Sequence, residues 1–267
     1  MHRRSWSQAR LVPPALTSLV LIGVWELLTR LDTSKVRLLP APSEIVRAMV
    51  RDSGPLLSQH VPITLLETVI GLGIAIVLGA GLAALLDFSA LLKRAVYPLL
   101  IISQTVPLVA IAPVLILLFR FGITPKVVTV ILFTFFPITV SLIDGLSATD
   151  PDLVALLRSM GARRGQIWRL IRLPAALPSF FSGLRIAATY AMSGAIIGEF
   201  ITAQYGLGRY LRSSYNSGRL DGAFAAIVIT AILSIIMVAL VRLLEHLMLP
   251  WFFAQSRRAG WDEPGIY

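Results

Sequence analysis

The sequence predicts an all-α membrane protein that crosses the bilayer six times. Of the 267 residues, 56% are hydrophobic, and the mean hydropathy of the chain is +0.80. A soluble domain has an apolar share of only about 45–50%, even when glycine is counted. Six apolar runs follow one another along the chain, each close to the roughly 20 residues that a transmembrane helix needs. We therefore expect one transmembrane domain over residues 11–250.

The first run, residues 11–31, follows a basic segment, residues 1–10. A signal peptide also begins in this way, but its apolar region is only about 7–15 residues long and a small-residue cleavage site follows it. We therefore expect a retained span, with the N-terminus in the cytoplasm. Residues 32–62 are polar and should form an external loop, with a short amphipathic surface helix over residues 43–51.

The second and fifth runs, residues 63–86 and 180–201, both repeat a small residue every four positions. Small residues on one face let another helix approach closely, since lipid offers no hydrophobic drive for helix association. We expect another helix to pack on the face of the second run, and we expect the face of the fifth run to look into the bundle or across a subunit interface. The repeats are Gly71, Ala75, Gly79 and Ala83 in the second run, and Gly183, Ala187, Ala191 and Ala195 in the fifth.

Glu199 continues the repeat of the fifth run, four residues after Ala195. An ionisable side chain within a span is costly and is often functional. Three interpretations are open at this point. Glu199 lines the translocation pathway or its gate, pairs with a basic residue, or is solvated at the end of its span.

The third run, residues 96–119, is interrupted by three prolines. A proline inside a helix frees a backbone carbonyl, and irregular backbone at membrane depth needs protein or a water-filled cavity around it. Gln104 and Pro107 are therefore candidates for the wall of a pathway, with a plain kink as the alternative. Residues 120–126 should form a short external turn before the fourth run, residues 127–143.

The sixth run, residues 222–244, follows a polar external loop, residues 204–221, and leads into a tail, residues 251–267. Six spans place both termini on the same side as the loop between the fourth and fifth runs, residues 150–174. Lys and Arg are enriched in cytoplasmic loops in general. Here they are spread over both sides, so the expected cytoplasmic position of both termini depends on that loop.

The loop of residues 150–174 is too basic to enter the bilayer, because its five arginines would each be costly in hydrocarbon. It predicts a short helix with Asp150 as N-cap and Gly161 as a left-handed C-cap. A helix this short is marginal alone, so its apolar stripe predicts a groove in a partner protein. The alternative is an interfacial helix whose arginines meet lipid phosphates. The stripe consists of Leu153, Leu156, Leu157 and Met160.

In this loop Gly161 is followed ten positions later by Ile171 and then by Leu173 and Pro174. This spacing resembles the EAA loop of permease subunits of bacterial ABC importers. The chain departs from the pattern at the Glu-Ala-Ala positions, where it has Ala155, Leu156 and Leu157. The resemblance implies a type I ABC importer permease fold, whose cytoplasmic coupling helix docks on a separate ATPase. The residues that it implies for ATPase coupling are Asp150, Leu153, Leu156, Leu157, Met160, Gly161, Ala162, Ile171, Leu173 and Pro174.

The same resemblance implies the function and the partners of the chain. Such permeases sit in the bacterial cytoplasmic membrane, usually pair as homodimers in lipid, and work with ATPase subunits and an external solute-binding protein. By overall likeness the chain is most similar to the sulfonate, nitrate and thiamine-precursor group. Within it, a pyrimidine precursor of thiamine is the best match for the solute, and sulfonate, taurine, nitrate and riboflavin-like solutes are alternatives.

Several kinds of chemistry are absent from the sequence. It has no G-x-x-x-x-G-K-[ST] phosphate loop, so we expect ATP to bind to the partner, and we expect no cofactor on this chain. With no cysteine and three dispersed histidines we expect no metal site. The net charge of +10 is scattered among loops, which argues against nucleic-acid binding. The alternative function is an ion-coupled secondary transporter or channel, with Glu26, Glu67 and Glu199 as candidate ion-coupling groups.

Overall fold

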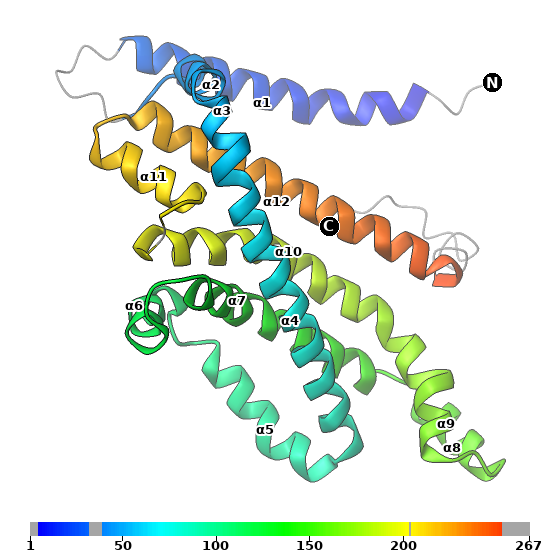
Figure 1. Ribbon diagram of the computed structural model, residues 1–267. Helices are drawn as coiled ribbons and strands as arrows, with labels where there is room; N and C mark the ends of the chain where they lie inside the picture. The colour runs from blue at the N-terminus through cyan, green and yellow to red at the C-terminus, as the bar shows by residue number, and fades with distance from the viewer. Residues whose placement is uncertain (1–4, 32–38, 203, 253–267) are drawn as a thin grey trace.

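The computed structural model describes residues 5–31, 39–202 and 204–252, and every regular element within these ranges is a helix. The all-α prediction is therefore confirmed. The long helices are α1 (Ser5–Leu31), α4 (Val61–Phe88), α7 (Thr124–Ser147), α10 (Leu173–Thr202) and α12 (Leu220–Met248) (Figure 1). The others are α2 (Pro42–Arg51), α3 (Ser53–Pro55), η1 (Leu56–His60), α5 (Ala90–Ser103), α6 (Leu108–Phe119), α8 (Pro151–Ser159), α9 (Arg164–Ile167), η2 (Trp168–Arg172) and α11 (Leu207–Asn216), where η marks a π-helical turn.

Helices α4, α7 and α10 pack against one another and form the core of the bundle, and α12 packs along α10 (Figure 1). Ile138 of α7 and Phe181 of α10 are fully buried where these helices meet. Such close packing rather than hydrophobicity must hold helices together in lipid.

The two small-residue faces lie inside this core, as predicted. All four small residues of the α4 repeat are buried, and so are all four of the α10 repeat. The fit is tight, since a Cβ added to Gly71 would lie 2.6 Å from Val130 Cβ, and one added to Gly183 would lie 2.5 Å from the Pro137 carbonyl oxygen. The small residues therefore set the distance between α7 and its two neighbours.

Four helical segments of the described chain are long and apolar enough to span a membrane: residues 53–88, 124–147, 164–201 and 220–248. Helices α5 and α6 together give a fifth candidate, although they are bent by 90° relative to each other. The count of six spans thus stays a prediction. The break falls between Ser103 and Leu108, so Pro107 precedes the second helix while Pro98 and Pro113 lie inside helices.

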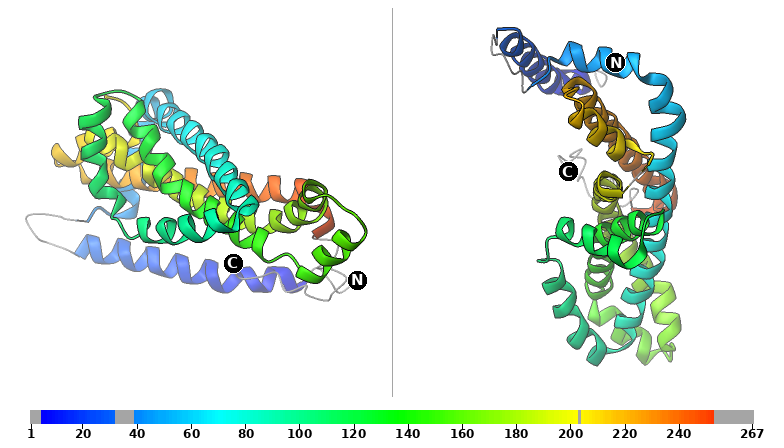
Figure 2. Two further views of the ribbon diagram at one scale, coloured as in Figure 1. Left: turned by 90° about the horizontal axis from the view of Figure 1, so that it is seen from below. Right: turned by 60° about the vertical axis from the view of Figure 1, so that its left-hand side comes forward.

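Short helices cover the two ends of the bundle. At one end, α2 packs on the start of α12, and α11 lies between α10 and α12 and contacts η1. The loop with α8 and α9 lies at the other end of α10 (Figures 1 and 2). We call these the α11 end and the α8 end. Helix α2 matches the predicted surface helix, whereas α11 falls within residues 204–221, where we expected only a polar loop. Of the predicted tail, residues 253–267 lie outside the described residues.

Candidate functional site

The predicted coupling helix is present as α8, and its own residues cap both of its ends. The Asp150 carboxylate accepts a hydrogen bond from the backbone N–H of Asp152 at 2.9 Å. At the other end, Gly161 has a φ of +84°, and the N–H groups of Gly161 and Ala162 donate to the carbonyls of Arg158 and Leu157, both at 3.0 Å. This pair of bonds is the Schellman arrangement, which needs a left-handed residue at the glycine position. The sequence prediction of both caps is confirmed.

Most of the apolar stripe of α8 is exposed. Leu153, Leu156 and Met160 are 39%, 56% and 75% accessible, and Leu157 is half-buried. A nine-residue helix that presents leucines to solvent and fully buries none of its residues has little of the packing that would normally stabilise it. The predicted stripe therefore exists as an uncovered apolar surface.

Two arginines attach this loop to the ends of α4 and α7. The Arg172 guanidinium forms an ion pair with Asp87 at 2.7 Å and donates to the Leu146 carbonyl at 3.0 Å. Arg164 donates to the Phe88 carbonyl at 2.6 Å and lies over the Phe88 ring, with 5.6 Å to the ring centroid. These contacts link the loop that carries α8 to the ends of both core helices.

The remaining residues of the loop pattern form the start of α10. Ile171 lies in the π-helical turn η2, and Leu173 and Pro174 are the first residues of α10. All three are half-buried, and the helical segment from Arg164 to Ile201 is continuous. The loop pattern thus joins α8 to the helix that carries Glu199 at its far end.

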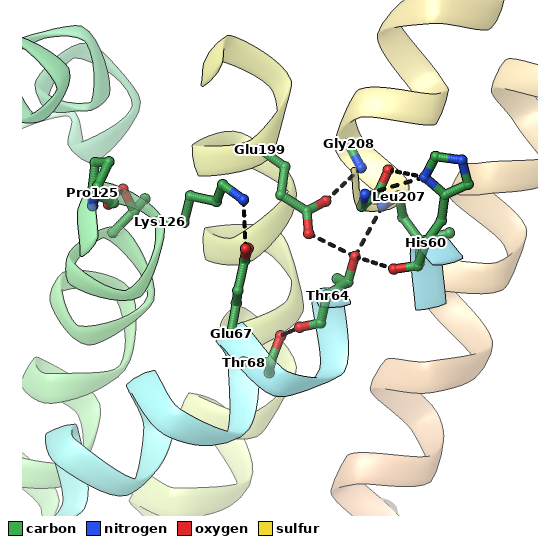
Figure 3. A network of polar contacts seen from close by, with 11 residues as sticks. His60, Thr64, Glu67, Thr68, Pro125, Lys126, Glu199, Leu207 and Gly208 are labelled. Carbon is green, nitrogen blue, oxygen red and sulfur yellow. Dashed lines mark hydrogen bonds and ion pairs between the residues drawn. The ribbon is translucent and has the colours of Figure 1, made fainter. Parts of the chain in front are cut away.

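A cluster of buried charged side chains lies at the α11 end, where α4, α7 and α10 meet (Figure 3). Lys126 Nζ of α7 forms an ion pair with Glu67 Oε1 of α4 at 2.5 Å. Glu67 and Glu199 are 1% and 0% accessible, and Lys126 is 8% accessible. We call Glu67, Lys126 and Glu199 the buried triad.

Glu199 is held by a hydroxyl and a backbone N–H group (Figure 3). The Thr64 hydroxyl donates to Glu199 Oε1 and the Gly208 N–H donates to Oε2, both at 2.7 Å. Gly206, with a φ of +114°, packs directly on the carboxyl group, so that a Cβ there would clash with Glu199 Cδ. The carboxylate thereby ties α10 to α4 and to the first turn of α11.

This geometry excludes one of the interpretations that the sequence left open for Glu199. Solvation at the end of a span is wrong, because the side chain is fully buried. Glu199 makes no direct ion pair among the described residues, because Lys126 pairs with Glu67, so pairing of Glu199 with a basic residue is not confirmed. Gln104 and Pro107 are exposed at the α5–α6 bend, and the assignment of these two and of Glu199 to a pathway stays a prediction.

The sequence pointed to Glu67 only as a candidate ion-coupling group, and its pairing with Lys126 was not predicted. The expected external turn of residues 120–126 is wrong at its end, because α7 begins at Thr124 and buries Lys126 in its first turn. A signal was present in the sequence. Glu67 stands four residues before Gly71 and Glu199 four residues after Ala195, so each small-residue repeat that packs in the core ends in a glutamate. Two glutamates on packed faces require a buried cation, since unpaired buried charges are very costly.

A second set of charges lies nearer the surface at the α11 end. Asp52, the C-cap of α2, receives hydrogen bonds from Arg51 at 3.1 Å, from the Tyr210 hydroxyl at 2.5 Å and from Arg219. Partial burial alone would raise the pKa of Asp52, but the hydrogen bonds from Arg51 and Tyr210 and the charge of Arg219 outweigh it and lower the pKa to about 2. Burial and the Asp52 charge raise the pKa of Tyr210 to about 12.

Comparison with known proteins places the chain in a transport family. The model of the family described as binding-protein-dependent transport system inner membrane component matches residues 75–249. The chain belongs to this family. It is thus a multi-pass permease component of an ABC importer, as the loop spacing suggested, and a transport subunit rather than an enzyme. Partner ATPases and binding proteins belong to importers of this family in general.

Individual relatives carry more specific names. The formylaminopyrimidine transport permease protein ThiX of Halalkalibacterium halodurans is 41% identical over 238 residues, which cover 89% of this chain and 95% of the relative. The taurine transport system permease protein TauC of Escherichia coli is 26% identical and covers 92% of both chains. A crystal structure of an amino acid ABC transporter with histidines has a TM-score of 0.58 at 18% identity over 76% of this chain and 96% of that one. This last likeness supports the permease fold.

Proposed function

We propose that this permease imports a pyrimidine precursor of thiamine, and that α8 couples it to a separate cytoplasmic ATPase. The observation that carries the coupling is the capped helix α8 with its uncovered leucines. The similarity to the formylaminopyrimidine permease over nearly the whole of both chains supports the substrate class.

The structure supports a rigid mode of coupling. An ATPase that moved α8 would pull on Asp87 through Arg172 and on the Phe88 carbonyl through Arg164, and would act directly on α10 through η2. Rigid-body rocking of helix bundles around a central site is a common form of alternating access. In this proposal both termini are cytoplasmic, two copies of the chain enclose the pathway, and Gln104 and Pro107 at the α5–α6 bend line it.

The ATPase contact is tested by Leu156→Asp. Burying a leucine contributes about 1.5–3 kcal/mol, so its loss should weaken ATPase binding at least tenfold. The measurement is the affinity of the purified permease in nanodiscs for the ATPase encoded beside it. Ala155→Asp places the same charge on the opposite, exposed face of α8, and we expect binding near that of the unaltered protein. Equal binding by Leu156→Asp and the unaltered chain would contradict docking on the stripe.

The substrate class is tested by uptake into proteoliposomes that contain the permease, its ATPase and its external binding protein. We expect ATP-dependent uptake of formylaminopyrimidine, with little uptake of taurine or riboflavin. Preferential uptake of taurine would contradict the proposed substrate class but would still support an ATP-driven importer. Uptake that persists without ATP and with an ion gradient would favour the secondary-transporter alternative instead.

A further inference from the structure

The buried triad contains one atom that its neighbours leave unsatisfied. Within the described residues, Glu67 Oε2 has no hydrogen-bond partner, although Glu67 is 1% accessible. The other oxygen, Oε1, receives the Lys126 ammonium. An orphaned buried oxygen on a charged group is costly, and native structures rarely leave one. A donor is therefore missing from the site.

The Glu199 carboxyl group points into the same buried space as the Glu67 carboxyl group, beside the Lys126–Glu67 ion pair (Figure 3). Two ionised carboxylates cannot share such a position at low cost, because their charges repel across a site without water. The triad counts one positive and two negative charges if all three groups are ionised, which leaves a buried net charge of −1. One added proton removes this charge and supplies the missing donor.

We propose that the triad binds one proton, held by Glu199 and donated to Glu67 Oε2. Glu67 is the carboxyl that stays ionised, because the Lys126 ammonium contacts it directly and favours its charged form. Glu199 then donates one hydrogen bond and still accepts those of Thr64 and Gly208, so every polar atom of the triad has a partner. The charges are +1 on Lys126, −1 on Glu67 and zero on Glu199.

Other titratable groups near the site do not replace this proton. His60 of η1 faces the Gly206 backbone, with its Nδ1 atom 2.9 Å from the carbonyl oxygen and 3.1 Å from the nitrogen, and the Arg209 charge of α11 acts on His60. From α4 and α7 the facing charged groups are Glu67 and Lys126. Lys126 also lines a pocket of about 380 Å³ at the α11 end, together with Gln204 and Tyr205. Water in this pocket would reach Lys126, the most accessible member of the triad.

The proposal predicts how many carboxyl groups are protonated, and isotope-edited infrared spectroscopy can count them. The protein carries ¹³C-labelled glutamate in nanodiscs at pH 7, and the readout is the carbonyl stretch of a protonated carboxyl group. The unaltered chain should show the band of one residue. Glu199→Gln should lose it, and Lys126→Met should double it, because Glu67 without its ammonium also takes a proton. No such band in the unaltered protein would overturn the proposal, whatever the variants do.

The control is Glu245→Gln. Glu245 of α12 is also buried and ion-paired, with Arg185 of α10 at 2.6 Å. Its loss should leave the band unchanged. A band that disappears in Glu245→Gln, or that survives both Glu199→Gln and Glu67→Gln, would assign the proton elsewhere and refute the site. Transport activity enters none of these readouts, so the result is independent of the proposed substrate and ATPase contact.

Discussion

The two ends of α10 differ in which side chains are buried and which are exposed. At the α11 end, charged side chains are buried and find their partners within the chain, as Lys126 does with Glu67. At the α8 end, apolar side chains such as Leu156 and Met160 are exposed, and only the backbone of their helix is satisfied by caps. The first arrangement joins α4 to α7 through contacts within the chain. The second leaves an apolar surface uncovered in this chain, and this is the surface that we propose docks on the ATPase.

Helices α4 and α10 both run between the α11 end and the α8 end. Helix α4 carries Glu67 near its start and Asp87 near its end, and at 1.5 Å per residue these lie about 30 Å apart. We therefore predict that substitutions at the α11 end change the stability of the bundle, and that substitutions at the α8 end change the affinity for the ATPase.

Breaking the buried ion pair should have the largest effect. Lys126→Met leaves the Glu67 charge buried and unpaired, and removing one member of a buried pair costs about 3–5 kcal/mol. We expect the lower end of this range, because Glu67 can take up a proton. The measurement is unfolding of the permease in mixed micelles as the denaturing detergent is increased. Arg94→Met, which removes an exposed cation, should change stability little. Equal loss in both variants would show that the triad does not hold the bundle.

The second prediction concerns the close approach of α4 and α7. The Cβ of Gly71→Ala would lie 2.6 Å from Val130 and push the helices apart, and overpacking of this kind costs about 1–3 kcal/mol. Gly73→Ala is the matched control, two residues along the same helix, because nothing lies within 4 Å of its added Cβ. The same unfolding assay should separate the two variants. If they were equally stable, the small-residue face would not set the helix spacing.

The predictions from sequence succeeded where the signal is local and periodic. The small-residue repeats of α4 and α10 predict which face of each helix is packed, and Asp150 and Gly161 predict where α8 begins and ends. The pairing of Lys126 with Glu67 joins residues 59 positions apart and depends on how α4 packs on α7. No local pattern contains that information. Helix α11 was missed for a related reason, since its ten residues are mostly polar and only a few, among them Leu207, are buried.

The third prediction tests the cap of the docking helix. Gly161→Ala places a Cβ in a left-handed conformation at a cost of about 1–2 kcal/mol, which should fray α8 and weaken ATPase binding by roughly tenfold. Stability of the bundle should not change, since α8 contributes no fully buried residue. Gly165→Ala has free space around its added Cβ and should bind normally. Gly161→Asn should recover part of the loss, because asparagine tolerates this conformation. A global loss of stability in Gly161→Ala would contradict the separation of the two ends.

The smallest effect is expected at the outer charges of the α11 end. Asp52→Asn removes partly exposed ion pairs with Arg51 and Arg219, which contribute about 0.2–1 kcal/mol. Because the pKa of Asp52 is lowered to about 2 in the folded chain, its contribution is fully present above the ordinary value of 3.8 and is lost as the pH falls through 2. The difference in unfolding free energy between Asp52→Asn and the unaltered chain should therefore be constant from pH 5 to neutral pH and shrink below about pH 4. Asp152→Asn removes an exposed carboxylate at the α8 end, and it should change the unfolding free energy of the bundle little in the same assay. A difference in unfolding free energy that instead grew toward low pH would mean that the fold stabilises the protonated form of Asp52. In that case the ion pairs of Asp52 would not stabilise the bundle.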